Sequence, residues 1–201
     1  HQHSRQKDFL GPIAERILKR TSETIYIYKS LQPLNTLKRM VVAIPPKAEL
    51  EPGFSHWFMK LTVICKEAGM SAICFGTPET LRELEDLGSR SNYIKQEFRP
   101  FSNWDDFLIL SKELRPNDLF VIIASRKGHV SYNQQLDKMP YYLSSYFNSN
   151  SFLMVYPKQL DYGKIGNVDH VDTSLIDSIS GRVGKVGKVA GYLRKLLAKK
   201  K

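Results

Sequence analysis

The chain has 201 residues and a formal net charge of +10 at pH 7, with 42% hydrophobic and 25% charged residues. This length suffices for one well-buried domain with appendages or for two small domains, and the composition is ordinary for a soluble globular protein. No apolar run approaches the roughly 20 residues that span a bilayer, and the opening HQHSRQKDF lacks the apolar core of a signal peptide. We therefore expect this fragment itself to be soluble.

The predicted elements begin with a helix over Asp8–Arg20 and a strand over Thr24–Tyr28. A similar piece lies near residue 150, where a helix opening at Asp137 and Pro140 precedes the strand Phe152–Tyr156. Both pieces combine a proline-initiated helix, a Ser/Thr/Asn turn and an apolar strand. The sequence therefore indicates an internal repeat, in which the N-terminal pair is the end of a preceding copy of the same fold. We expect Thr24–Tyr28 to pair antiparallel with Phe152–Tyr156, and the helix to cover this junction through Phe9, Ile13 and Ile17.

From Arg39 onward, apolar strands alternate with helices. The expected strands are Arg39–Ile44, Ser71–Phe75, Tyr93–Phe98, Leu119–Ala124 and Phe152–Tyr156. The expected helices are Phe54–Ala68, one opening at Thr77 and ending at Leu84, one capped by Ser102 or Asn103 and containing Leu114, and one before the last strand. This alternation predicts an α/β fold with a doubly wound, five-stranded parallel sheet and right-handed crossovers, of Rossmann-like class.

The loop that follows the strand Leu119–Ala124 is the first candidate site, because loops leaving the carboxyl ends of parallel strands line the ligand crevice. Its cations and Lys47, which follows the first strand, can together hold a phosphate. The alternative, and the commoner case, is that they are ordinary solvated loop cations. The candidate ligand-binding residues are Pro45, Lys47, Ser125, Arg126, Lys127, Gly128 and His129.

The positive charge is concentrated in the last residues. Eight basic and no acidic residues occur from Ser178 to Lys201, which leaves +2 for the rest of the chain. Apolar residues from Ile176 to Leu197 recur every three or four positions, as on one face of a helix, although four glycines interrupt them. Such a helix can lie on an anionic membrane; a solvated extension, a partner helix and binding to nucleic-acid phosphates are the alternatives. The candidate contact residues are Arg182, Lys185, Lys188, Arg194 and Lys195.

Motifs for catalysis or metal binding do not stand out. The chain has no GxSxG, HExxH, CxxC or P-loop, and its five histidines are scattered. Cys65 and Cys74 lie in apolar stretches without the spacing of a metal site or of a disulfide framework, so we expect buried, reduced thiols. We do not expect an enzyme, nor a bound metal.

The strand MVVAI, and VIIASRKGH followed by a helix and FLMVYP, resemble the universal stress protein fold. More narrowly, IYIYKSLQPLNTLKRMVVAIPPKAELEPGF, NDLFVIIASRKGHVSY and SFLMVYPKQ resemble the cytosolic C-terminal region of bacterial sodium/hydrogen exchangers of the monovalent cation/proton antiporter-2 family. The resemblance covers Asp8 to Leu160. In that family a membrane transport domain precedes tandem stress-protein-like repeats.

The resemblance implies a non-catalytic regulatory domain at the cytoplasmic face of the bacterial inner membrane, with the transport domain of the same polypeptide as its partner. Residues 1–34 would be the end of a preceding repeat plus a linker, 35–160 a stress-protein-like domain, and 161–201 a linker and the basic tail. Surface left bare by the missing part of that repeat favours a homodimer of this fragment. The alternatives are a free-standing nucleotide-binding stress protein and a nucleic-acid-associated protein that acts through its tail.

The resemblance also bears on ATP. ATP-binding members carry an aspartate at the end of the first strand, where this chain has Pro45. Their phosphate loop places three glycines, whereas the corresponding positions here are Ala124 or Ser125, Lys127 or Gly128, and Met139-Pro140. We therefore expect no tightly bound cofactor and at most weak ATP binding, with another anionic ligand as the alternative.

Overall fold

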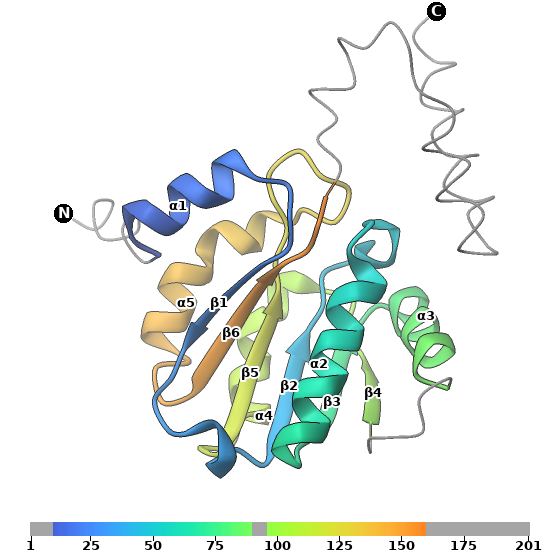
Figure 1. Cartoon of the computed structure of the whole chain (residues 1–201), viewed down its shortest axis with the longest axis vertical. Helices are drawn as coiled ribbons and strands as arrows, with labels where there is room; N and C mark the ends of the chain where they lie inside the picture. The colour runs from blue at the N-terminus through green and yellow to red at the C-terminus, as the bar shows by residue number, and fades with distance from the viewer. Residues whose placement is uncertain (1–9, 90–95, 160–201) are drawn as a thin grey trace, which may run out of the picture. The chain divides into compact units, whose positions relative to one another are not determined.

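A computed structural model describes residues 10–89 and 96–159 of the chain (Figure 1). The chain divides into two units, His1–Leu160 and Asp161–Lys201, and every element described below belongs to the first. The expectations for Phe9, for Tyr93–Lys95 and for the basic tail fall outside the described residues.

Six strands form one mixed sheet in the order β1-β6-β5-β2-β3-β4 (Figure 1). Neighbours from β6 to β4 are all parallel, whereas β1 pairs antiparallel with β6. The predicted α/β class and the mostly parallel sheet are confirmed, and β1 adds a sixth strand at the edge. The strand bounds are β1 Ile25–Lys29, β2 Arg39–Ala43, β3 Ser71–Gly76, β4 Gln96–Pro100, β5 Asp118–Ile123 and β6 Ser151–Tyr156.

Helices cover both faces of the sheet because side chains of a strand alternate between its two sides. In β5, Leu119 and Val121 join a core with residues of α2 (Phe54–Ala68) and α3 (Pro78–Gly88). Phe120 and Ile122 join a second core on the opposite face. That face is covered by α4 (Leu110–Glu113), α5 (Met139–Ser145) and the 3-10 turns Trp104–Ile109 and Gln134–Lys138. Leu10, which lies just before α1 (Gly11–Arg20), packs on the same face. The four inner strands β2, β3, β5 and β6 are therefore buried on both sides, which explains why they are almost continuously apolar.

The helix bounds follow the sequence with local differences. Helix α2 matches its prediction and ends at Gly69, whose φ of +64° is the left-handed conformation that favours glycine. Helix α3 continues past Leu84 to Gly88. Asn103 caps the next segment as predicted, but that segment is a 3-10 turn followed by the short α4, which ends before Leu114.

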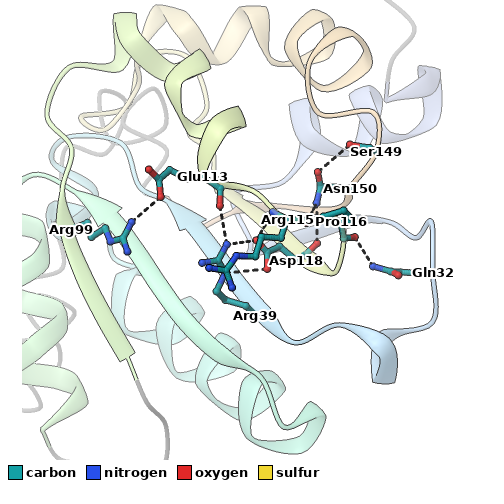
Figure 2. Close-up of polar contacts among 9 residues, drawn as sticks. All are labelled: Gln32, Arg39, Arg99, Glu113, Arg115, Pro116, Asp118, Ser149 and Asn150. Carbon is teal, nitrogen blue, oxygen red and sulfur yellow. Dashed lines mark hydrogen bonds and ion pairs between the residues drawn. The ribbon is translucent and has the colours of Figure 1, made fainter.

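The amino ends of β2 and β5 are fastened by an ion pair (Figure 2). Arg39 and Asp118 are register partners in these strands, and the Arg39 guanidinium donates to both carboxylate oxygens, with 3.0 Å from Nε to Oδ1. The side chain of Asp118 is 1% exposed and also accepts from the backbone N–H of Arg115 at 2.8 Å. Arg39 donates to the carbonyl of Glu113 as well. This network fixes the register of the two central strands at one end of the sheet.

The N-terminal helix–strand pair is only partly as expected. Strand β1 pairs antiparallel with β6, with Ile27 opposite Met154, which confirms that prediction. The expectation that Ile13 and Ile17 cover the junction is wrong, because these side chains are 71% and 48% exposed. Helix α1 instead turns the side that carries Ala14 and Leu18 toward the domain, and both residues are half-buried.

Two further observations concern the described residues. Cys65 and Cys74 are buried free thiols, as expected. None of the helices in the described part of the chain combines the length and the apolar character needed to cross a membrane.

Candidate functional site

The two central strands define the place where a ligand would be expected in this topology. The chain passes from β2 to β3 on one side and from β5 to β6 on the other, so strand order reverses between β2 and β5. In open α/β sheets, ligands bind at this reversal, beyond the carboxyl ends of the strands. Strand β2 ends at Ala43 and β5 at Ile123, so the segments that follow them, with the candidate residues from Pro45 and from Ser125, border this crevice.

A buried polar cluster of the chain's own side chains occupies this end of the sheet. Glu51, between the 3-10 turn Ala48–Leu50 and α2, is 5% exposed. Its Oε1 accepts hydrogen bonds from the Ser131 hydroxyl at 2.7 Å, from the Ser131 backbone N–H at 3.2 Å and from the Gln159 amide at 3.0 Å. A carboxylate can stay buried when hydrogen bonds satisfy it in this way. An internal anion therefore sits beside the loop predicted to hold a phosphate.

Gln159 joins this carboxylate to the loop after β5. It is 1% exposed, and its amide nitrogen also donates to the Ser125 hydroxyl at 2.7 Å. Its carbonyl oxygen accepts from the backbone N–H of Arg126 at 3.0 Å and from the guanidinium at 3.2 Å. Both halves of the Gln159 amide are thus used, and one backbone N–H at the start of the loop is engaged within the chain.

Gly53 brings the segment after β6 against the start of α2. Its N–H donates to the carbonyl of Lys158 at 3.0 Å. A Cβ at Gly53 would lie 2.5 Å from the backbone nitrogen of Lys158, a distance at which the backbone must move. Glycine here permits the close approach that carries Gln159 into the cluster.

The Arg126 side chain forms its hydrogen bonds with other parts of the chain. Its guanidinium donates to the carbonyls of Pro157 and Glu23, both at 2.8 Å, and more weakly to that of Leu18 at 3.4 Å. It also lies over the ring of Tyr156, 5.8 Å from the centroid. Burial lowers the pKa of Arg126 and raises that of Tyr156 to about 12. The side chain predicted to hold a phosphate instead ties the segment between α1 and β1 to the end of β6.

The other candidate ligand-binding residues differ in how deeply they are buried. Lys127 is exposed and pairs with Asp137 at 2.8 Å, which raises the pKa of Lys127 through a hydrogen bond. Gly128 is exposed with a φ of +86°. His129 is half-buried, and its backbone N–H donates to the carbonyl of Arg126 at 3.3 Å. Pro45 is buried, whereas Lys47 is exposed. The structure thus brings Ser125 and Arg126 into one polar cluster and leaves Lys47 and Lys127 at the surface.

The β2–β3 side of the crevice is also filled. The indole N–H of buried Trp104 donates to the carbonyl of Ile44 at 3.1 Å. Beside the N-terminus of α3, the Thr80 hydroxyl donates to Glu49 at 2.6 Å. The strand-end carbonyl of Ile44, which can contact a ligand in an open crevice, is therefore bonded to the chain.

A small cavity lies elsewhere, between α2 and the sheet. It has a volume of about 10 Å³, and its lining includes Met40, Ala72 and Gln96 from the amino-terminal halves of β2, β3 and β4. The space suffices for about one water molecule. It lies toward the end of the strands opposite the crevice.

Sequence reasoning missed Glu51, Ser131 and Gln159 as a group. Glu51 and Gln159 are 108 residues apart, and each lies in a turn or loop where a polar side chain is usually solvated. A usable signal is the position of Glu51 just before α2, because the helix dipole favours a carboxylate near a helix N-terminus.

A search of protein-family models, of curated proteins and of solved structures found no match for this chain.

Proposed function

We propose that this chain is a non-catalytic regulatory domain of a monovalent cation/proton (sodium/hydrogen) antiporter, with a universal-stress-protein-like fold. It acts at the cytoplasmic face of the bacterial inner membrane, and its partner is the membrane transport domain of the same polypeptide. The sequence resemblance from Asp8 to Leu160 supports the family, and the arrangement of the internal repeat supports a tandem of stress-protein-like copies.

The ladder between β1 and β6 is the observation that carries this proposal. In the internal repeat, Ile25 and Ile27 correspond to Phe152 and Met154. The ladder pairs Ile27 directly with Met154, so a local two-fold axis through this pair exchanges the two equivalent strands. The side chains of both residues lie on the sheet face that α5 covers. Two copies of one fold joined through their last strands have this geometry.

The crevice supports a role other than nucleotide binding. Glu51 places a carboxyl group beside the loop that was predicted to hold a phosphate, and Gln159 engages one loop N–H that would otherwise be free to donate to an anion. A carboxylate and a phosphate that lie close together repel each other. We therefore infer that the domain works by binding to other parts of its polypeptide, with any anionic effector held weakly.

The test is the activity of the whole polypeptide. We expect the reading frame upstream of His1 to encode a series of membrane-spanning helices. In everted vesicles, the whole polypeptide should exchange protons for Na⁺ or K⁺, and deleting residues 35–160 should shift the pH or cation dependence without abolishing exchange. Vesicles without the protein are the control. An upstream frame without membrane helices, or complete loss of exchange on the deletion, would overturn the proposal.

Calorimetric titration separates this proposal from a free-standing nucleotide-binding protein. We expect ATP to bind this chain with a dissociation constant no tighter than about 1 mM, an affinity of only about 4 kcal/mol. Micromolar binding that is lost when Arg126 and Lys127 are both changed to Ala would favour the nucleotide-binding alternative.

A further inference from the structure

The outer edge of β1 is open in the described part of the chain. Strand β6 pairs with β5 on one side and with β1 on the other, and β1 is the last strand in the sheet order. An edge strand presents unpaired N–H and C=O groups, which can pair with another strand. Strand β1 consists of IYIYK, in which Lys29 at the end is the one charged residue and proline is absent, so the edge from Ile25 to Tyr28 is suited to such pairing.

Exposed apolar side chains gather in the same segment. Twelve large hydrophobic side chains are exposed in the described residues, and six of them lie between residues 13 and 34. The six are Ile13 and Ile17 of α1, Tyr26 and Tyr28 of β1, and Leu31 and Leu34 after it. They do not form one patch, because Tyr26 and Tyr28 alternate with Ile27 along β1 and lie on the opposite face of the sheet from the core that Ile27 and Leu10 join. Exposed apolar side chains therefore occur on both sides of the open edge.

The apolar spacing around α1 is the same as that before β6, although it is shifted by two residues from the alignment that places Pro12 on Pro140. Leu10, Ile13 and Ile17 follow one another by three and four residues, as Leu136, Met139 and Leu143 do. The second set is 8%, 0% and 1% exposed and packs in a core with Phe120 and Ile122 of β5. In the first set, Ile13 and Ile17 lack such a strand to cover, which accounts for their exposure.

We propose that the outer edge of β1 and the face of α1 that carries Ile13 and Ile17 bind the remainder of a preceding copy of this fold in the same polypeptide. The strand of that copy equivalent to β5 pairs parallel with β1, as β5 pairs with β6. This inference rests on the tandem arrangement in the proposed function and adds the surface, the direction of pairing and the side chains involved.

A second copy of this chain does not offer the same partner. Its β5 is already flanked by β2 and β6, and the open edges among the described strands are β1 and β4. A preceding copy is different, because α1 and β1 themselves stand where its last helix and strand would be. Its β5-equivalent strand therefore has a free side, and its apolar face can bury Ile13 and Ile17 at the same time.

The test compares this chain with the longer polypeptide that the upstream reading frame encodes, by hydrogen–deuterium exchange at a concentration where both are monomers. We expect the amides of Ile25–Lys29 to exchange at least about tenfold more slowly in the longer form. Ile13→Glu with Ile17→Glu should leave the Tm of the short chain unchanged, because both sites are exposed, and should lower that of the longer form. Met59→Glu with Val63→Glu on α2, at 44% and 52% exposure, is the matched control and should change neither.

Equal exchange of β1 in both forms, or an Ile13/Ile17 variant that behaves like the control in the longer form, would overturn the inference. So would an upstream frame that encodes no second α/β domain, or a dimer through β1 that persists in the longer form, since this would assign the edge to a second copy. A second α/β domain that protects β1 without any membrane helices upstream would overturn the antiporter proposal and leave this inference standing.

Discussion

At the scale of single residues, the buried carboxyl group of Glu51 is the main polar group at the carboxyl ends of the central strands. Its Oε1 accepts three hydrogen bonds, two from Ser131 and one from the Gln159 amide, which also donates to the Ser125 hydroxyl. The carboxylate therefore satisfies the buried donors of the cluster.

We expect Glu51→Ala to lower the free energy of unfolding by about 2 kcal/mol, because it leaves buried donors without an acceptor. Urea unfolding followed by circular dichroism measures this. Glu67→Ala, at an exposed position of α2, is the control and should stay within about 0.5 kcal/mol of the parent protein. Equal stability of the two variants would show that Glu51 is not held as described.

The two thiols give a pH dependence. Burial raises the pKa of Cys65 and of Cys74 to about 12 from an ordinary value of 9.0. Between pH 9 and about 12 the unfolded chain therefore loses thiol protons that the folded chain keeps, so stability falls as the pH rises through this range. We expect a double variant, Cys65→Ala with Cys74→Ala, to have a shallower decline of Tm above pH 9, whatever its stability at pH 7. An unchanged slope would contradict this.

At the scale of the elements, Arg126 links three segments. Its guanidinium bonds to carbonyls before β1 and after β6, and to the last turn of α1. We expect Arg126→Ala to speed tryptic cleavage at Lys19 and Arg20 several-fold, because α1 loses its connection to the end of β6. Lys127→Ala is the matched control, since Lys127 is exposed and pairs with Asp137 at the surface of the same loop region. Equal cleavage rates in the two variants would argue against this role of Arg126.

The ion pair between β2 and β5 is a second link between elements. Asp118→Asn should cost about 3 kcal/mol, because it leaves the Arg39 guanidinium, 13% exposed, without its charged partner. A double-mutant cycle with Arg39→Met should give a coupling energy above about 1 kcal/mol. The exposed pair Lys158–Glu23, at 51% and 64% exposure, should give less than about 1 kcal/mol in the same kind of cycle. Similar coupling in both cycles would contradict the burial argument.

The helices and strands that can be predicted from the sequence are those with a clear local pattern of apolar residues. Strands such as β5 consist of apolar, largely β-branched runs, and α2 has an apolar face followed by a glycine. The apolar face of α1 can be predicted for the same reason. A periodic pattern shows that a helix has an apolar face, but it does not show which residues pack against that face. The prediction that Ile13 covers the β1–β6 junction is therefore wrong. The sequence points to Arg126 as a candidate site residue, but its acceptors are mostly backbone carbonyls, one of them 108 residues away, and local spacing cannot reveal these.

At the scale of the whole molecule, the basic tail stays a prediction, because it lies outside the described residues. We expect the full chain to bind vesicles that contain phosphatidylserine at low salt, and a chain ending at Leu160 not to bind them. Cosedimentation measures this, with neutral phosphatidylcholine vesicles as the control. Binding that survives the truncation, or no binding by the full chain, would contradict a membrane role for the residues from Ser178 to Lys201.

The ladder between β1 and β6 also affects how the chain folds as it is made. Thr24 and Lys158, which meet at one end of this ladder, are 134 residues apart. At synthesis rates of roughly 5–20 residues per second, β1 leaves the ribosome roughly 7 to 27 s before its partner strand exists. A nascent strand with two open edges is prone to pair wrongly during this interval. In the proposed tandem, a copy of the domain synthesised earlier would already offer a parallel strand to β1, and each domain would shelter the first strand of the next until its synthesis is complete.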